Sequence, residues 1–112
     1  NMQYRLQTTR EATEDVAGMA EYIVEKFKNL DAALSFLDKY DTEVQRLKNF
    51  PFGYRGVSFE YRGYEIRIKS FDTYNVFFIV DIEDHCVYIL RVLKDRQDWK
   101  SIMANPLEYH FG

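Results

Sequence analysis

The apolar residues of this 112-residue chain change their spacing once, at the segment FPFGYRG (residues 50–56), and that change limits the folds open to it. Before this segment they recur every three or four residues, the spacing of helices that bury one face. After it they alternate with polar residues, the spacing of strands with one buried face. The sequence therefore predicts a helical first half and a stranded second half.

The first half begins with a short predicted strand at 3–8, followed by a helix from about 9 to 28. Thr8 followed by Glu11 is a capping-box pattern for this helix. Asn29 can end it and cap a second helix, which stops before the segment NFPFG. Because only a residue or two separate the helices, we expect an antiparallel hairpin that packs its apolar stripes against a sheet.

In the second half, alternation at 57–61 and at 64–69 flanks a turn at 62–63, and two further strands are predicted at 74–81 and 86–93. We count three consecutive antiparallel strands, followed by a short helix with Trp99 and Ile102 packed down. The predicted class is α+β, a helix hairpin packed on a small antiparallel sheet in the order β-α-α-β-β-β-α. We expect one domain over 1–112, with Asn1 left from expression and Met2 as the natural start.

Composition excludes several classes of protein. Apolar residues make up 46% of the chain, enough for one modest core. The apolar runs are far shorter than the roughly 20 residues of a membrane span, and we expect a cytoplasmic protein without a leader. Cys86 is the single cysteine, so no intramolecular disulfide can form. Motifs for nucleotides or catalytic zinc are absent, and the acidic turn around His85 lacks calcium-site spacing, so neither cofactor nor metal is expected.

Charge is distributed unevenly along the chain. The net charge is −3, which by itself argues against a nucleic-acid partner. Residues 10–45 carry nine acidic and four basic side chains, whereas residues 46–70 carry six basic and two acidic ones. A local positive face can attract anions although the whole molecule is acidic.

The element order, the loop FPFGYRG, the strand YRGYEIRIKSF and the hairpin TYNVFFIVDIEDHCVYILRVLKDRQDW together resemble the RelE/ParE superfamily. These are toxins of bacterial type II toxin-antitoxin modules, including plasmid stabilisation proteins. The resemblance covers nearly the whole chain. The ending RVLKDRQDW, with Asp95, Arg96 and Trp99, is closer to the ParE-like branch.

The resemblance implies different activities on one scaffold. ParE-like members arrest growth by binding and poisoning DNA gyrase, without chemistry of their own, and this is our first prediction. RelE-like members are endoribonucleases that cut messenger RNA on the ribosome, and this is the alternative. A third reading is an inactive toxin relative that persists as a binding partner.

The resemblance also indicates site residues. The family's basic groove corresponds to Arg67, Lys69 and Arg91, and the full predicted target-binding set is Arg62, Arg67, Lys69, Arg91 and Arg96. In a nuclease these cations would clamp a phosphate, and in a gyrase poison they would be contact residues. The alternative for each is an ion pair with a neighbour such as Glu65 or Asp95.

A nuclease would also need an acid and a base at the cleaved phosphate. The end of the last strand reads Asp95-Arg96, which does not match the His-Tyr type of pair found in compact mRNA-cleaving relatives. The remaining catalytic candidates are Tyr109 and His110. His85 is expected to be a solvated turn residue.

A cognate antitoxin is the partner that the resemblance implies, and gyrase or the ribosome with mRNA is the target. The antitoxin is expected to dock on exposed apolar positions of the helix pair or on an open sheet edge. Without it, a homodimer through the helix hairpin is expected.

Overall fold

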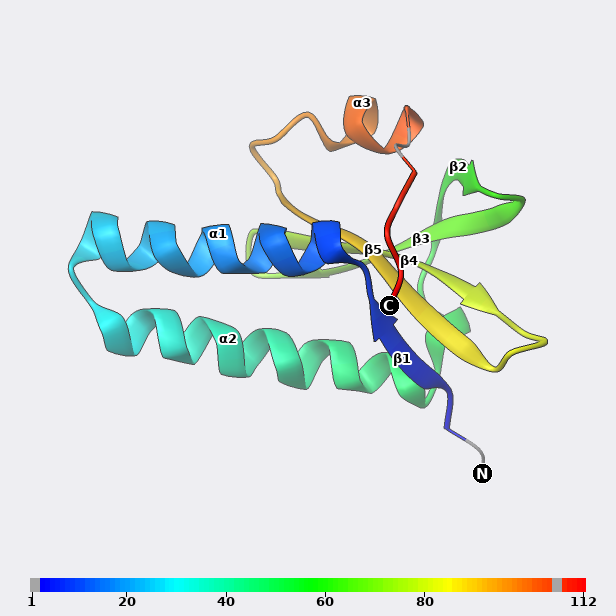
Figure 1. Ribbon diagram of the computed structural model, residues 1–112, viewed down its shortest axis with the longest axis horizontal. Helices are drawn as coiled ribbons and strands as arrows, with labels where there is room; N and C mark the ends of the chain where they lie inside the picture. The colour runs from blue at the N-terminus through cyan, green and yellow to red at the C-terminus, as the bar shows by residue number, and fades with distance from the viewer. Residues whose placement is uncertain (1–2, 106–107) are drawn as a thin grey trace.

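The computed structural model, which describes residues 3–105 and 108–112, places an antiparallel helix hairpin on one face of a five-stranded sheet (Figure 1). The elements are β1 (Arg5–Thr8), α1 (Arg10–Phe27), α2 (Leu30–Gln45), the short 3₁₀ turns η1 (Arg46–Lys48) and η2 (Pro51–Gly53), β2 (Gly56–Tyr61), β3 (Tyr64–Phe71), β4 (Tyr74–Asp81), β5 (Cys86–Lys94) and α3 (Trp99–Ala104). The predicted α+β class is confirmed. The expectations for Asn1 and Met2 lie outside the described residues.

The sheet has the strand order β1-β5-β4-β3-β2. The last four strands pair antiparallel in sequence, but β1 lies parallel to β5, with Leu6 opposite Val87. The sheet is therefore mixed, and it holds one strand more in the second half than the predicted order. The turn predicted at 62–63 is present, with φ of 52° at Arg62 and 83° at Gly63, and the alternating segments on its two sides are separate strands, β2 and β3. Alternation reveals strands, but it does not reveal which strands pair.

Side-chain caps fix the start of both long helices. The Thr9 hydroxyl accepts the Ala12 N–H at 3.0 Å and donates to the Leu90 carbonyl at 2.8 Å, so it ties α1 to β5. The predicted cap at Thr8 was thus wrong by one residue, because Thr8 is still paired in β1. Asn29 caps α2 as predicted, by accepting the Ala32 N–H at 3.0 Å.

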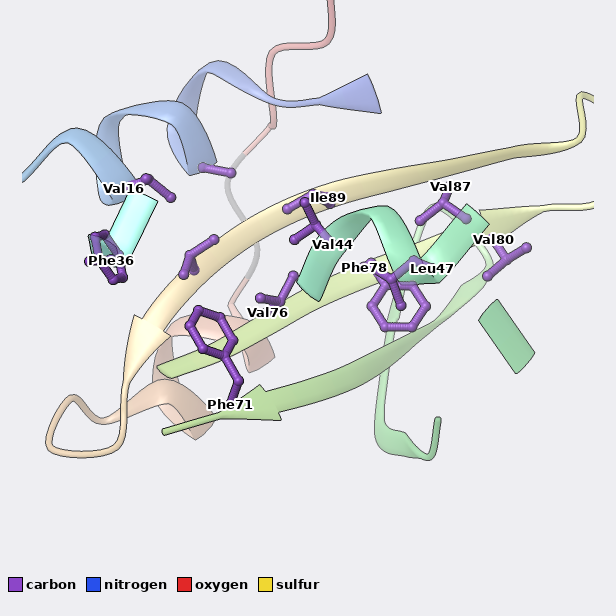
Figure 2. Close-up of a cluster of buried hydrophobic side chains, with 12 residues drawn as sticks. Val16, Phe36, Val44, Leu47, Phe71, Val76, Phe78, Val80, Val87 and Ile89 are labelled. Atoms are coloured by element: carbon purple, nitrogen blue, oxygen red, sulfur yellow. The ribbon is translucent and has the colours of Figure 1, made fainter. Parts of the chain in front are cut away.

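Apolar clusters cover both faces of the sheet. Between the hairpin and the sheet, helix residues such as Phe36 and Val44 meet strand residues such as Val76 and Phe78 (Figure 2). On the opposite face, α3 and the C-terminal segment cover a second cluster that includes Tyr61, Phe77, Leu90, Leu93, Met103 and Tyr109. With both faces covered, groups available to a partner gather at the edges, loops and helix surfaces.

The described residues support neither a membrane-spanning helix nor a metal site. None of their helices combines the length and apolar character needed to cross a membrane. Within 3–105 and 108–112, no three His, Cys, Asp or Glu side chains lie close enough together to hold a metal ion.

Candidate functional site

The predicted basic face of β3 points toward α2 and the loop before β2. Lys69 is only 5% exposed, and its Nζ lies 3.1 Å from Glu43 Oε1 and 3.2 Å from the Tyr54 hydroxyl. Arg67 donates to the Tyr54 carbonyl at 2.7 Å and pairs with Glu65 at 3.1 Å. Both cations are therefore engaged by neighbours within the fold, and for Arg67 the partner is the predicted Glu65.

Arg91 is held where α1 crosses the edge of β5. Its Nε and Nη2 donate to the two carboxylate oxygens of Asp15 at 2.7 and 2.9 Å, and the Val92 N–H donates to the same carboxylate at 3.0 Å. The hydrogen bond and the charge of Asp15 raise the pKa of Arg91. The pairing of β4 with β5 shifts by one residue next to Arg91, and Leu90 is the residue of β5 left without a partner there. The bidentate contact orders the junction of α1 with β5.

The C-terminal segment forms a strap between α1 and the β2–β3 turn. Glu108 pairs with Arg62, and the Tyr109 N–H donates to the Tyr61 hydroxyl at 3.1 Å. His110 donates its N–H to Glu11 Oε1 at 2.9 Å, and its Nδ1 lies 2.6 Å from Glu11 Oε2. Arg62 is thus part of the strap's attachment.

The two catalytic candidates face different surroundings. Tyr109 is 4% exposed, its hydroxyl lies 3.9 Å from Met103 Sδ, and burial raises its pKa. His110 lies at the surface, paired with Glu11. Tyr109 lines a cavity of about 430 Å³ with Arg91, Ser101, Ile102 and Asn105, whereas His110 is not among its lining residues. Tyr109 and His110 therefore do not converge as an acid and a base on this cavity.

Arg96 stands apart from the other four predicted cations. It lies in the β5–α3 loop and lines a groove of about 510 Å³, which we call the α1–β5 groove. The lining residues are Glu14, Asp15, Gly18, Met19, Tyr22, Lys94, Arg96 and Gln97. A Cβ at Gly18 would meet nothing within 4 Å, so the groove is open above this position.

Two lysines lie over the exposed ring of Tyr22, and Arg96 lines the same groove as this ring. Lys94 Nζ lies 5.2 Å and Lys26 Nζ 5.6 Å from the ring centroid. A hydrogen bond from Lys26, and then the charges of Lys26, Lys94 and Arg96, lower the pKa of Tyr22. Among the described residues no carboxylate oxygen lies within 4.0 Å of these three cations. Glu14 and Asp15 line the same groove, with Asp15 already paired with Arg91, and the three cations near Tyr22 are not ion-paired within the described chain.

Hydrogen bonds centred on the buried Asn75 fix the end of β5 and the loop that carries Arg96. Asn75, which is 4% exposed, donates to Asp95 Oδ1 at 2.7 Å, and the Asp95 N–H donates to the Thr73 carbonyl at 2.9 Å. Gln97 Oε1 accepts the Lys94 N–H at 2.8 Å. Asp95 thus anchors the loop and orients its basic neighbours outward.

Sequence reasoning identified Arg96 but missed Lys26, Lys94 and Tyr22. One signal was present, because Tyr22 and Lys26 are spaced i, i+4 on the predicted first helix and therefore share a face. The proximity of Lys94 and Arg96 to Tyr22 could not be read from the sequence, because α1 lies beside the end of β5 only in the folded chain.

Comparisons with known proteins agree with this architecture. A family model described as the ParE toxin of type II toxin-antitoxin system, parDE, matches residues 6–99. The match includes α1, the whole sheet from Leu6 onward and the loop of Arg96. A search of curated proteins found no significant match.

Proposed function

Because this chain belongs to the ParE toxin family of type II toxin-antitoxin systems, we propose that it arrests growth by binding and poisoning DNA gyrase through the α1–β5 groove. The observation that carries the proposal is the group of Lys26, Lys94 and Arg96 around Tyr22, with no carboxylate partner in the described part of the chain. Unneutralised cations beside an exposed aromatic ring are typical of a contact surface for an anionic partner. The proposed place of action is the cytoplasm.

The other predicted cations differ from Arg96 in what they already bind. Arg67, Lys69 and Arg91 would have to give up ion pairs, most of them partly or fully buried, to contact a target. Leaving a buried carboxylate without its partner costs several kcal/mol, on the order of 3–5. We therefore assign these three to supporting the fold behind the contact surface. Arg62 is exposed and paired with Glu108 at the β2–β3 turn, and it is not among the residues that line the groove, so we leave it outside the proposed surface.

The RelE-like alternative is favoured by one observation. Arg91 uses two of its N–H groups on Asp15, and the guanidinium also lines the cavity shared with Ser101, Asn105 and Tyr109. Guanidinium has five N–H donors, so a phosphate in this cavity has donors left to bind. The buried Tyr109 hydroxyl and the distant pairing of His110 weigh against catalysis there.

A pair of assays distinguishes the readings. Purified protein is added to gyrase supercoiling and DNA-cleavage reactions, and in parallel to a translating extract whose messages are mapped by primer extension. Gyrase-linked DNA breaks with intact message support the proposal. Message cut within codons with gyrase unaffected supports the nuclease reading, and no effect in either assay supports an inactive relative.

Groove variants then test the location. Lys94→Gln/Arg96→Gln removes two unpaired surface charges, and Gly18→Leu fills the groove from α1 without meeting another atom at Cβ. Both should fold normally and lose gyrase inhibition. Lys28→Gln/Lys39→Gln is the matched control, since it removes two exposed lysines from the helix hairpin. If the groove variants inhibit like the wild type while the control fails, the surface is misplaced.

The family implies an antitoxin partner, and we propose that it docks on the helix hairpin. Phe27, Leu30 and Leu34 are 62%, 62% and 51% exposed. Leu30 and Leu34 line a shallow groove of about 310 Å³ together with Ala20, Glu21, Val24, Glu25, Ala33 and Leu37. Its apolar floor and acidic rim fit an amphipathic helix with basic flanks.

Leu30→Ser/Leu34→Ser should abolish rescue by the co-expressed antitoxin without reducing toxicity, because both side chains are largely exposed. Unchanged rescue would contradict this docking surface. If the hairpin instead forms a homodimer, the isolated wild type sediments as a dimer and the variant as a monomer.

A further inference from the structure

A second aromatic surface lies at the opposite end of the molecule from the α1–α2 connection, beside the start of β1 (Figure 1). Phe50 and Phe52 flank the buried Pro51 and are 70% and 42% exposed. The Gly53 N–H donates to the Phe50 carbonyl at 3.2 Å, and a Cβ at Gly53 would lie 2.6 Å from the Phe50 ring. The tight turn thus exposes two large apolar rings to solvent, and packing in the core does not account for phenylalanine at these positions.

Phe52 belongs to a connected set of rings from distant parts of the chain. Phe52 packs edge-on against Tyr4, with centroids 6.3 Å apart and planes at 77°. Tyr4 in turn stacks on His85 from the β4–β5 turn, with centroids 3.8 Å apart and planes at 17°. The rings hold one another in place at the surface, so their remaining faces are ordered for a planar ligand.

One cation contacts these rings, and two more belong to the chain segment that carries Phe50 and Phe52. The Arg67 guanidinium carbon lies 4.9 Å from the Phe52 centroid. Lys48 accepts the Tyr4 N–H on its carbonyl at 2.8 Å, and Arg55 lies at the end of the same loop, where its carbonyl accepts the Ile68 N–H at 3.0 Å. Within the described chain, neither Lys48 nor Arg55 has a carboxylate oxygen within 4.0 Å of its side-chain nitrogens.

Some acidic side chains near this surface already have an ion-pair or hydrogen-bond partner. Glu65 pairs with Arg67 at 3.1 Å, and the Asp84 N–H donates to Asp81 in the β4–β5 turn at 3.1 Å. Arg5 reaches the Asp84 carbonyl at 3.5 Å and adds a further positive charge beside Tyr4. The β4–β5 turn is acidic through Asp81, Glu83 and Asp84, so the cations of this surface without a carboxylate partner among the described residues are Lys48 and Arg55, on the segment before β2.

We propose that this surface, which comprises Tyr4, Lys48, Phe50, Phe52, Arg55 and His85, binds single-stranded nucleic acid. Every base has a face that can stack on an exposed aromatic ring, and unpaired lysine and arginine beside the rings can follow the phosphates. Bases in a duplex are already stacked on one another, so the exposed rings favour an unpaired strand. The surface is separate from the α1–β5 groove, and the inference does not depend on gyrase being the target.

The test is fluorescence anisotropy of the full chain with a 5′-labelled dT12 strand, with the corresponding duplex as comparison. We expect binding at low salt that weakens as salt rises, with the single strand preferred over the duplex. Phe50→Ser/Phe52→Ser should weaken binding at least about fivefold, the lower end of what losing one stacked base does. Lys48→Gln/Arg55→Gln should reduce the slope of log K against log salt by roughly 0.7 for each phosphate that the variant no longer neutralises.

Phe27→Ser is the matched control for the rings, because Phe27 is 62% exposed but lies at the tip of the helix hairpin. It should bind dT12 like the wild type. An equal loss in Phe27→Ser, equal affinity for strand and duplex, or no binding by the wild type would overturn the proposal. Phe27→Ser should melt at the wild-type temperature, since its side chain is largely exposed, whereas Phe50→Ser/Phe52→Ser also removes the contact of Phe52 with Tyr4. Thermal melts of every variant separate a folding defect from a loss of binding.

Discussion

Replacing Lys69 with methionine should destabilise the protein rather than remove a target contact. The variant keeps an unbranched stem but leaves the Glu43 carboxylate, 14% exposed, without the ammonium at 3.1 Å. Removing one partner of a buried pair costs about 3–5 kcal/mol. Arg46 remains 3.3 Å from Glu43 and offsets part of this, so we expect a loss of about 2–3 kcal/mol. At this chain length that corresponds to roughly 8–12 °C in Tm.

Urea denaturation of Lys69→Met and of Glu43→Gln/Lys69→Met measures the effect. The double variant should be less destabilised than the sum of its single changes, because no carboxylate is left unpaired. Lys39→Met is the control, since Lys39 pairs with Asp72 at 2.9 Å on the surface and should cost less than about 1 kcal/mol. A Lys69→Met protein as stable as the wild type, yet unable to arrest growth, would refute the reasoning and make Lys69 a contact residue.

Three further predictions concern the strap, the groove and the helix cap. Hydrogen bonds from the His110 backbone and ring lower the pKa of Glu11 from 4.5 to about 2, so its carboxylate stabilises the fold fully above pH 4.5. Denaturation curves across pH measure the free energy of unfolding of the wild type and of Glu11→Gln, and the difference between them should shrink as pH drops toward 2. A difference that stays constant with pH would contradict this prediction. Gly18→Ala should raise stability by roughly 0.5–1 kcal/mol in urea melts, because the position is helical and open, and a loss would show hidden crowding. Thr9→Ala should cost about 1–3 kcal/mol in the same melts, since it removes the α1 cap and leaves the Leu90 carbonyl unpaired, and near-neutral stability would contradict that role.

Local patterns predicted most of the fold. The helical spacing of apolar residues predicted one buried face on each helix, and Val16 and Val44 lie on those faces in the core. Alternation placed the last two strands within one residue of their observed ends. Asn29 was recognised as a cap because its side chain acts on a backbone group only three residues away. Such features depend on contacts within a few residues of the chain.

The site was harder to predict because its contacts are long-range. Asp15 and Arg91 are 76 residues apart in sequence, and their pairing follows only from α1 crossing the edge of β5. The alternation that marked Lys69 as surface is also consistent with a face covered by α2, which is what the structure has. Lys94 and Tyr22 likewise become neighbours only when the helix hairpin packs on the sheet.

The most direct test of the central claim is the affinity of purified gyrase for the wild-type protein and for Lys94→Glu/Arg96→Glu, measured beside Lys28→Glu/Lys39→Glu. The account predicts that wild type and control bind alike and that the groove variant binds at least about tenfold more weakly, because like charge replaces the complementary surface. Equal binding by all three proteins, or no binding by the wild type, would contradict it.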